Sequence, residues 1–391
     1  MASEALFLLQ DVAEYVRSLG RQGLKQSLRG GIDHSQLPHG RPAMDPVERL
    51  HPPKMQLRVA EIITETPSTK TLRLQRTDGP MPPFRAGQYI DLRVQIDGVH
   101  TGRPYSISSR PGVGFVDVTV REKAGGFVSL YLLGALQVGA ELESSGPAGR
   151  FYHEPLIDGR RLVFLAGGSG ITPLMSIIRH AAAHEQDLEI TLLYGSRSPD
   201  DVIFEHELEA LSRGSSRLRY LPVISEPPDG YRGRTGLLDA ARIRAEVGDV
   251  GGRTFYLCGP HAMVELTRAA LGELGVPRHR IRRELHGPIA DITRHPRWPS
   301  GLGPDAVFDV AIEGRATIRA RAGASLLDSL ERAGVRVPCL CRSGECGACR
   351  LRVLAGRVLV TEEARVRESD VPLGYVHCCA VYPLENLTIR M

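Results

Sequence analysis

The stretch Val337-Pro-Cys-Leu-Cys-Arg-Ser-Gly-Glu-Cys-Gly-Ala-Cys349 decides how the rest of the chain is interpreted. Its last three cysteines follow the spacing C-x4-C-x2-C, and they are Cys341, Cys346 and Cys349. Gly344 and Gly347 allow this loop to wrap closely, so that backbone N–H groups can point at the sulfur atoms. The stretch therefore predicts a redox-active metal centre held by thiolates.

This spacing, with a fourth cysteine far along the chain, is the plant-type pattern for a 2Fe-2S cluster. Two candidates for the fourth ligand, Cys378 and Cys379, follow downstream. The segment Gly374-Tyr-Val-His-Cys-Cys-Ala-Val-Tyr-Pro383 resembles the fourth-cysteine segment of plant-type ferredoxins, and its trailing proline favours Cys379. Cys339 and Cys378 are then interpreted as buried bystanders. The alternative is a structural zinc site, but such sites usually combine two close cysteine pairs, or one pair with histidines.

The length of 391 residues predicts about three domains. The net charge of +4, with charges of both signs interspersed, does not indicate a nucleic-acid partner. Seven cysteines, most of them gathered at one place, favour a reducing compartment, and we expect a cytoplasmic location. We expect neither a transmembrane span, because no apolar run reaches 18 residues, nor a secretory signal, because the N-terminus lacks a basic region and a cleavage site.

Residues 1–53 are assigned to an N-terminal segment. Leucines and valines recur at helical spacing over residues 5–29, with arginines and lysine on the remaining face, which predicts one amphipathic helix. Packing on its own protein is favoured over a membrane or partner surface. Residues 30–53 are rich in glycine, proline and histidine and predict an extended connector.

Residues 54–154 consist of short alternating runs separated by turn residues, which predict an antiparallel β-barrel or sandwich. Three motifs follow one another here: Arg103-Pro-Tyr-Ser106, Gly125-Gly-Phe-Val-Ser129 and Gly146-Pro-Ala-Gly-Arg-Phe151. Each motif alone is weak, but in this order they resemble the flavin domain of the ferredoxin-NADP reductase family.

The chemistry of these motifs agrees with the resemblance. The ring of Tyr105 can stack on an isoalloxazine, the hydroxyl of Ser106 can reach its N5 edge, and Arg103 can neutralise a phosphate. The backbone amides that open the following helix can seat a second phosphate. The cofactor-binding residues expected here are Arg103, Tyr105, Ser106, Arg121, Gly126, Val128 and Ser129. The resemblance implies FAD and not FMN, because Gly-Pro-x-Gly-x-Phe accompanies FAD in that family.

Residues 155–290 alternate strands with helices, which predicts an α/β domain with a parallel sheet covered on both faces. Gly167-Gly-Ser-Gly-Ile-Thr-Pro173 joins the first strand to its helix, and Cys258-Gly-Pro260 follows another strand. Glycines at a helix start allow close approach of a pyrophosphate. Both segments resemble the NAD(P) domain of the same family, which implies nucleotide binding by Gly167, Gly168, Gly170, Thr172, Cys258, Gly259 and Pro260.

Several roles in this domain stay open. Thr172 and Cys258 would flank the nicotinamide, and Ser106 and Cys258 are the expected catalytic residues, although a lone cysteine is more often a buried small hydrophobe. Ser196 and Arg197 stand where the 2′-phosphate of NADPH would lie, which leaves the choice between NADH and NADPH open. Glu284 matches the family's carboxylate near the end of the domain, but the aromatic residue that should follow is absent.

Residues 291–305 predict a linker, and residues 306–391 predict a β-grasp ferredoxin domain, in which a hairpin and a helix precede the cluster loop. The order flavin, nicotinamide, cluster resembles that of oxygenase reductases. It implies that NAD(P)H supplies electrons in pairs, that FAD divides the pairs, and that the cluster passes single electrons to a protein acceptor. An oxygenase component is the favoured acceptor. The alternatives are an anaerobic or corrinoid partner and a cofactor-binding redox sensor.

Overall fold

The computed structural model describes residues 52–285, 287, 289 and 291–391. Of the two units into which the chain divides, the second, Leu50–Met391, holds all the elements that follow. The predicted amphipathic helix of residues 5–29 lies outside the described residues. Within the described part, none of the helices has the length and apolar character needed to cross a membrane.

The first part of the second unit is a six-stranded antiparallel barrel. Its sheet has the order β4-β3-β6-β1-β2-β5, and a further bridge between Ile107 and Val118 brings the two edges together. The helix α4 packs on this barrel through Val128 and Leu132. The strands are β1 (Met55–Thr66), β2 (Thr69–Arg76), β3 (Tyr89–Ile96), β4 (Val99–Ser106), β5 (Val116–Arg121) and β6 (Glu141–Ser144), and α4 spans Phe127–Gly134.

The next part is a parallel sheet with the strand order β10-β9-β8-β7-β11-β12. Two separate apolar clusters cover its faces, one with α6 and α7 and the other with α8 and α9. The strands are β7 (Arg161–Gly167), β8 (Glu189–Ser196), β9 (Leu218–Ile224), β10 (Arg234–Thr235), β11 (Thr254–Cys258) and β12 (Ile281–Glu284). The helices are α5 (Pro155–Asp158), which precedes β7, α6 (Ile171–Ala183), α7 (Glu205–Gly214), α8 (Ala240–Val247) and α9 (His261–Glu273). The order reverses between β7 and β11, and ligands of such sheets bind beside that point.

The last part is a β-grasp sheet with the order β14-β13-β19-β15-β17, in which β13 and β19 run parallel. The helix α10 packs on it, and the side chain of Ser325 caps the start of this helix by accepting from the Asp328 N–H. The elements are β13 (Val307–Ile312), β14 (Ile318–Arg321), α10 (Leu326–Arg332), β15 (Arg350–Ala355), β16 (Val358–Val360), β17 (Tyr375–His377), β18 (Val381–Pro383) and β19 (Leu387–Arg390). The predicted fold class is confirmed in all three parts.

Short 3-10 turns punctuate the described chain: η2 (Gly168–Gly170), η3 (Pro199–Asp201), η4 (Arg278–Arg280), η5 (Ile292–Arg294), η6 (Val371–Leu373) and η7 (Cys378–Ala380). One of them lies in the segment predicted as a linker. Ile292 is buried there against Leu359 and Tyr382, with Trp298 packed beside them. Part of this segment is therefore attached to the β-grasp sheet.

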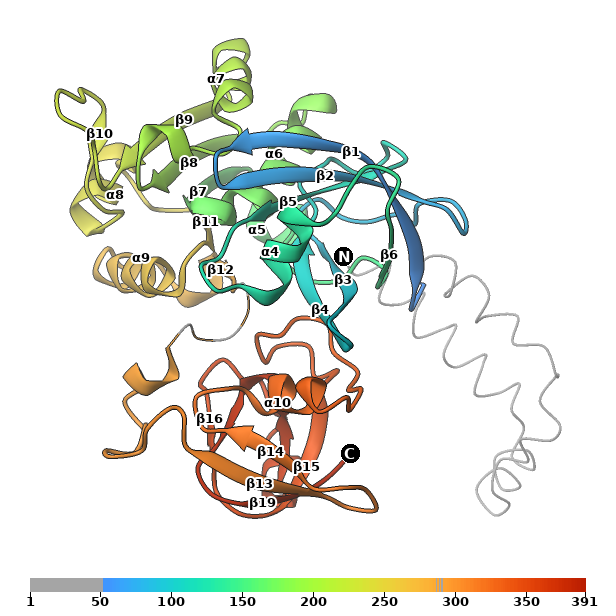
Figure 1. The fold of residues 1–391 in the computed structure, drawn as a ribbon. Helices are drawn as coiled ribbons and strands as arrows, with labels where there is room; N and C mark the ends of the chain where they lie inside the picture. The colour runs from blue at the N-terminus through green and yellow to red at the C-terminus, as the bar shows by residue number, and fades with distance from the viewer. Residues whose placement is uncertain (1–51, 286, 288, 290) are drawn as a thin grey trace, which may run out of the picture. The chain divides into compact units, whose positions relative to one another are not determined.

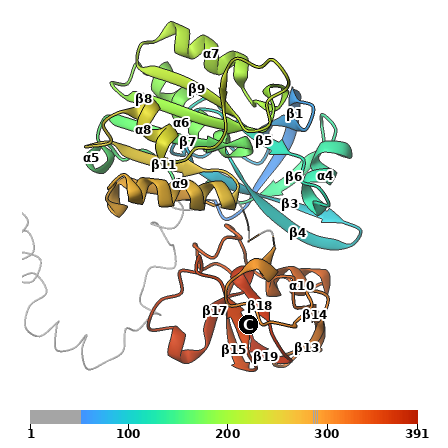
Figure 2. The ribbon, with the colours of Figure 1, turned by 90° about the vertical axis from the view of Figure 1, so that its left-hand side faces the viewer.

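The β-grasp part contacts the barrel through α10 and β4. Figures 1 and 2 show this contact from two directions, with β13–β19 and α10 in orange to red below the end of β4 in cyan. The cluster loop thereby comes close to the predicted flavin motif.

Candidate functional site

The cysteine loop brings its sulfur atoms together in pairs. The Cys341 sulfur lies within hydrogen-bonding reach of those of Cys346 and Cys379, and the Cys349 sulfur lies within reach of that of Cys379. The backbone N–H of Cys346 donates to the Cys341 sulfur at 3.3 Å. A thiolate at position 341 is stabilised by these neighbours, which hold the pKa of Cys341 well below its usual range.

Two glycines explain why the loop can wrap in this way. Gly344 has φ +82°, and a Cβ there would lie 2.8 Å from Cα of Ala364 and 3.0 Å from Cβ of Ala380. Gly347 has φ +75°, which also favours glycine. His377 Nδ1 donates to the carbonyl oxygen of Gly344 at 2.6 Å, which fixes the loop from the β17 side.

The donor set fits a 2Fe-2S cluster, because each iron of such a cluster takes two protein thiolates and the thiols here meet pairwise. Among the described residues, no three Cys, His, Asp or Glu side chains are arranged to hold one metal ion. Cys379 lies near both Cys341 and Cys349, whereas Cys378 lies near Cys349 and Cys339. This position is what the predicted fourth ligand requires.

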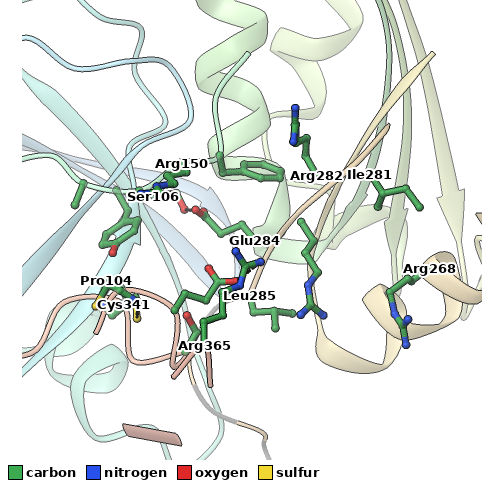
Figure 3. Close-up of a pocket in the computed structure, with 18 of the residues that line it drawn as sticks. Pro104, Ser106, Arg150, Arg268, Ile281, Arg282, Glu284, Leu285, Cys341 and Arg365 are labelled. Atoms are coloured by element: carbon green, nitrogen blue, oxygen red, sulfur yellow. Dashed lines mark hydrogen bonds and ion pairs between the residues drawn. The ribbon is translucent and has the colours of Figure 1, made fainter. Parts of the chain in front are cut away.

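A pocket of about 1150 Å³, the central pocket, lies between the barrel, the end of β12 with α9, and the cluster loop. Figure 3 shows Ser106, Glu284 and Cys341 converging on it from three segments far apart in the sequence. The lining residues include Tyr89, Pro104, Ser106, Ala148, Gly149, Arg150 and Phe151 from the barrel side; Arg268, Arg282, Arg283 and Glu284 from α9 and β12; and Cys341, Ser343, Glu345, Cys346 and Arg365 from the β-grasp side.

The pocket suits a flat aromatic cofactor with a polar edge. Gly149 has φ +102°, and a Cβ there would lie 2.9 Å from ring carbons of Tyr89, so only glycine leaves space beside this ring. Burial, followed by the charge at Cys341, raises the pKa of Tyr89 and keeps it neutral. On the polar side, the Ser106 hydroxyl donates to Oε1 of Glu284 at 3.0 Å. An isoalloxazine ring has the flat aromatic face and the polar edge that this pocket can accommodate.

The predicted flavin residues on β4 divide between two faces of the strand. Pro104 and Ser106 line the pocket, while Arg103 and Tyr105 point to the other side because side chains alternate along a strand. Tyr105 packs, partly buried, against the barrel core. Arg103 donates to Oγ1 of Thr101 at 2.8 Å and to the carbonyl oxygen of Gly102 at 2.7 Å. The roles predicted for Tyr105 and Arg103 therefore stay predictions.

The helix start predicted as a phosphate seat is built around Gly126. A Cβ there would lie 2.4 Å from Oγ of Ser129, so the serine side chain folds over the glycine. The N–H of Gly126 donates to the Lys123 carbonyl at 2.7 Å and is therefore already used. A phosphate would have to bind to the following backbone N–H groups of the first helical turn. Val128 is buried beneath them.

The glycine turn after β7 and the loop after β11 are pressed together at the switch point of the parallel sheet. A Cβ on Gly170 would lie 2.1 Å from the carbonyl oxygen of Cys258, and a Cβ on Gly167 would lie 2.3 Å from Sδ of Met263. A Cβ on Gly259 of the same loop would lie 3.0 Å from the backbone nitrogen of Gly167, and Pro260 precedes α9 as its N-cap. The structure thus brings the predicted nucleotide residues of both loops into one place.

Other predicted residues surround this turn. The Thr172 hydroxyl donates to the carbonyl oxygen of Ser169 at 2.9 Å, and Cys258 is fully buried in the core of the sheet. The side chain of Arg121, at the end of β5, extends to this turn. A Cβ on Gly168 would lie 2.6 Å from its Nη1. Arg121 also forms an ion pair with Asp201 of η3, a contact that the sequence did not indicate.

Comparison with known proteins agrees with this geometry. Residues 54–153 match the family "Oxidoreductase FAD-binding domain", residues 164–269 match "Oxidoreductase NAD-binding domain", and residues 310–384 match "2Fe-2S iron-sulfur cluster binding domain". The ferredoxin reductase component of 3-ketosteroid-9-alpha-monooxygenase from Mycobacterium tuberculosis is 31% identical over 349 residues, which cover 84% of this chain and 93% of the relative. The chain belongs to the ferredoxin-NADP reductase superfamily.

Two further comparisons support this placement of the reductase. The glycine betaine monooxygenase reductase subunit of Pseudomonas aeruginosa is 28% identical over 348 residues, covering 85% of this chain and 94% of the relative. The structure of phthalate dioxygenase reductase matches with a TM-score of 0.66 at 22% identity and covers 86% of this chain and 98% of that one, which shows the same fold. The protein is an NAD(P)H-dependent reductase that passes electrons through FAD to a 2Fe-2S cluster.

Sequence reasoning missed several residues of the reductase pocket. Tyr89 lies on a strand that was predicted, but nothing in the alternation of that strand distinguishes a pocket wall from a core residue. Arg268, Arg282 and Arg365 come from elements without a motif. The strand that carries Glu284 was not predicted as a strand, and its register beside β11 places the carboxylate opposite Cys258.

Proposed function

We propose that the electron acceptor of this reductase is the terminal component of an oxygenase. The observation that carries the proposal is that Cys341 and Cys346 line the same pocket as Ser106 and Glu284. A cluster held by these cysteines would lie beside the flavin site and take up the electrons that leave it. A cluster with one-electron chemistry suits a protein acceptor. Two of the relatives that span most of this chain are named as reductase components of monooxygenases.

Within this function we propose the following roles. When bound, FAD accepts a hydride from NAD(P)H and releases its two electrons singly. The Ser106 hydroxyl and the Glu284 carboxylate hold the polar edge of its site, and Cys258 and Thr172 stand where the nicotinamide arrives. Four thiolates hold the cluster, and they are those of Cys341, Cys346, Cys349 and Cys379.

We also propose a cytoplasmic location. All seven cysteines, which lie in the described part of the chain, are free thiols, and those around the cluster loop must stay reduced to bind iron. An oxidising compartment would favour disulfides between such close sulfur atoms instead.

The proposal is tested with the Cys346→Ser variant of the full chain and the oxygenase component encoded nearest to its gene. We expect the wild type to support NAD(P)H-dependent product formation by that oxygenase, and the variant to lose it while it still oxidises NAD(P)H with ferricyanide. Cys339→Ser is the matched control, because Cys339 lies near Cys349 without being a predicted ligand, and it should retain both activities. Equal loss of both activities in Cys346→Ser, or no product with the wild type, would contradict the proposal.

A further inference from the structure

The hydroxyl of Thr101 in β4 makes three hydrogen bonds, and two of them join the barrel to the β-grasp part. It donates to Oε2 of Glu331 at 2.8 Å, and it accepts from Nη2 of Arg342 at 3.1 Å and from Nη1 of Arg103 at 2.8 Å. A hydroxyl has one donor and two acceptor sites, so every site of this group is used. Thr101 is only 7% exposed, and all three partners carry charge.

The charges around this hydroxyl alternate across the contact between the two parts. Arg342 and Glu331 form a buried ion pair on the β-grasp side. Asp328 of the same side lies 3.3 Å from Nη1 of Arg342 and 3.6 Å from Nη2 of Arg103 on the barrel. Two guanidinium groups and two carboxylates therefore balance one another at this contact, the Arg342–Glu331 pair buried and the other two groups partly exposed. Thr101 touches three of the four groups.

Arg342 connects this network to the cluster loop. It directly follows Cys341, which lines the central pocket, and its side chain is 4% exposed. Its backbone has φ +51°, a left-handed conformation that is strained for a residue with a side chain. Such a conformation persists when the surroundings hold it, and here the ion pairs and the Thr101 hydroxyl do so.

Further contacts surround the network. Arg336 Nη2 lies 3.1 Å from Nε2 of His100, and the guanidinium of Arg332 lies 5.6 Å from the ring centre of Phe127 on α4. Each of these pairs joins the β-grasp side to the barrel. The contact is thus specific in geometry and charge and not a chance approach of two surfaces.

We propose that the Thr101 hydroxyl is a positioning group that holds the cluster loop against the flavin pocket through Arg342 and Glu331, and so sets the rate of electron passage to the cluster. The proposal rests on the reductase activity and not on the identity of the acceptor. It also gives Arg103 a role in the contact between the two parts, beside the phosphate role predicted from its motif.

The test is the Thr101→Val variant of the full holoprotein. Valine keeps the shape and the β-branched character that a strand favours, and it leaves the Arg342–Glu331 pair of the β-grasp side in place. Under anaerobic mixing with NAD(P)H, we expect cluster reduction to slow about tenfold or more, because hydrogen bonds to charged groups are lost. Flavin reduction should be unchanged. Hydrogen–deuterium exchange at residues 99–106 and 326–342 should become faster.

Two control variants make the outcome decisive. Thr101→Ser retains the hydroxyl and should restore both the rate of cluster reduction and the exchange protection. Thr77→Val removes an exposed hydroxyl that donates to the Gln56 carbonyl elsewhere on the barrel, and it should match the wild type. The proposal is overturned if Thr101→Val reduces its cluster at the wild-type rate, if Thr101→Ser is as slow as Thr101→Val, or if flavin reduction slows by the same factor as cluster reduction.

Discussion

The Ser106 hydroxyl donates a 3.0 Å hydrogen bond to Oε1 of Glu284, and this bond joins β4 of the barrel to β12 of the parallel sheet at the wall of the central pocket. Both residues are buried: Ser106 is 5% exposed and Glu284 is 8% exposed. A buried polar pair of this kind, beside the aromatic rings of Tyr89 and Phe151 in the pocket lining, fixes which edge of a flat ligand lies next to it.

We predict that Ser106→Ala and Glu284→Gln each slow flavin reduction by NAD(P)H roughly tenfold or more, since a hydrogen bond to a charged group is lost or weakened at the reacting edge. Stopped-flow absorbance of the flavin measures this rate. Ser144→Ala, which removes a buried hydroxyl that donates to the Ser145 carbonyl outside the pocket, should leave the rate unchanged. An unchanged rate in Ser106→Ala would remove this pair from the mechanism.

For the cluster, we predict that Cys379→Ser lowers the iron content of the purified protein, whereas Cys378→Ser keeps it. Cys379 lies within reach of both Cys341 and Cys349, and Cys378 contacts Cys349 and packs in the core of the β-grasp part. Iron analysis and the visible absorption of the cluster measure the outcome. Full iron in Cys379→Ser together with loss in Cys378→Ser would assign the fourth ligand to the neighbouring position.

At the nucleotide crevice, we predict that Gly170→Ala raises the KM for NAD(P)H roughly tenfold, because its Cβ would lie 2.1 Å from the Cys258 carbonyl oxygen and must push the two loops apart. Gly214→Ala at the end of α7 is the matched control, because nothing lies within 4 Å of its added Cβ. Steady-state kinetics with ferricyanide as acceptor compare the two. Equal KM values in both variants would show that the close approach is not needed for binding.

The choice of nucleotide can be tested at Arg197. Its side chain is 68% exposed just beyond β8, and the neighbouring Ser196 hydroxyl is buried without a hydrogen-bond partner in the described structure. We predict that Arg197→Ala lowers kcat/KM for NADPH by roughly tenfold and leaves that for NADH nearly unchanged, since only NADPH carries the 2′-phosphate. An equal change for both nucleotides would separate Arg197 from the recognition of this phosphate.

Asp91 of β3 predicts a dependence of stability on pH. Burial raises the pKa of Asp91 to about 7, against the opposing effect of Arg342 and Arg93, from an ordinary value of 3.8. The folded protein therefore binds this proton more tightly than the unfolded chain, and stability falls as the pH rises from about 4 to about 7, by at most roughly 4 kcal/mol.

Asp91→Asn removes this titration. We expect the difference in Tm, variant minus wild type, to be more positive at pH 8 than at pH 4.5, which thermal unfolding monitored by flavin fluorescence can measure. A difference that is constant with pH, or that falls as the pH rises, would contradict the prediction.

The sequence predicted best what depends on local spacing. The cysteine loop needs Gly344 and Gly347 between its ligands, and the turn after β7 needs Gly170 close to the next loop, so the chemistry of each is written within a few residues. The alternation of apolar residues also predicted the barrel, and the alternation of strands with helices predicted the parallel sheet. These features depend on backbone geometry, which a short motif determines.

What the sequence could not predict depends on pairs that are far apart along the chain. The position of Arg103 beside Asp328 follows from the docking of α10 on β4, and nothing in the motif around Arg103 indicates that partner. The same holds for Thr101, which precedes the motif and has no signature of its own. The short strand of Glu284 also went unpredicted, because its residues Ile281-Arg-Arg-Glu284 show no apolar pattern.

The shared wall of the central pocket, with Ser106 on one side and Cys341 on the other, has a consequence for the living cell. Two separate proteins would have to meet by diffusion for each delivery, and dilution would slow them. Here the flavin site and the cluster loop belong to one polypeptide, so the rate of electron transfer between them does not depend on the protein concentration. Only the final delivery, to a separate molecule, depends on how many copies the cell makes.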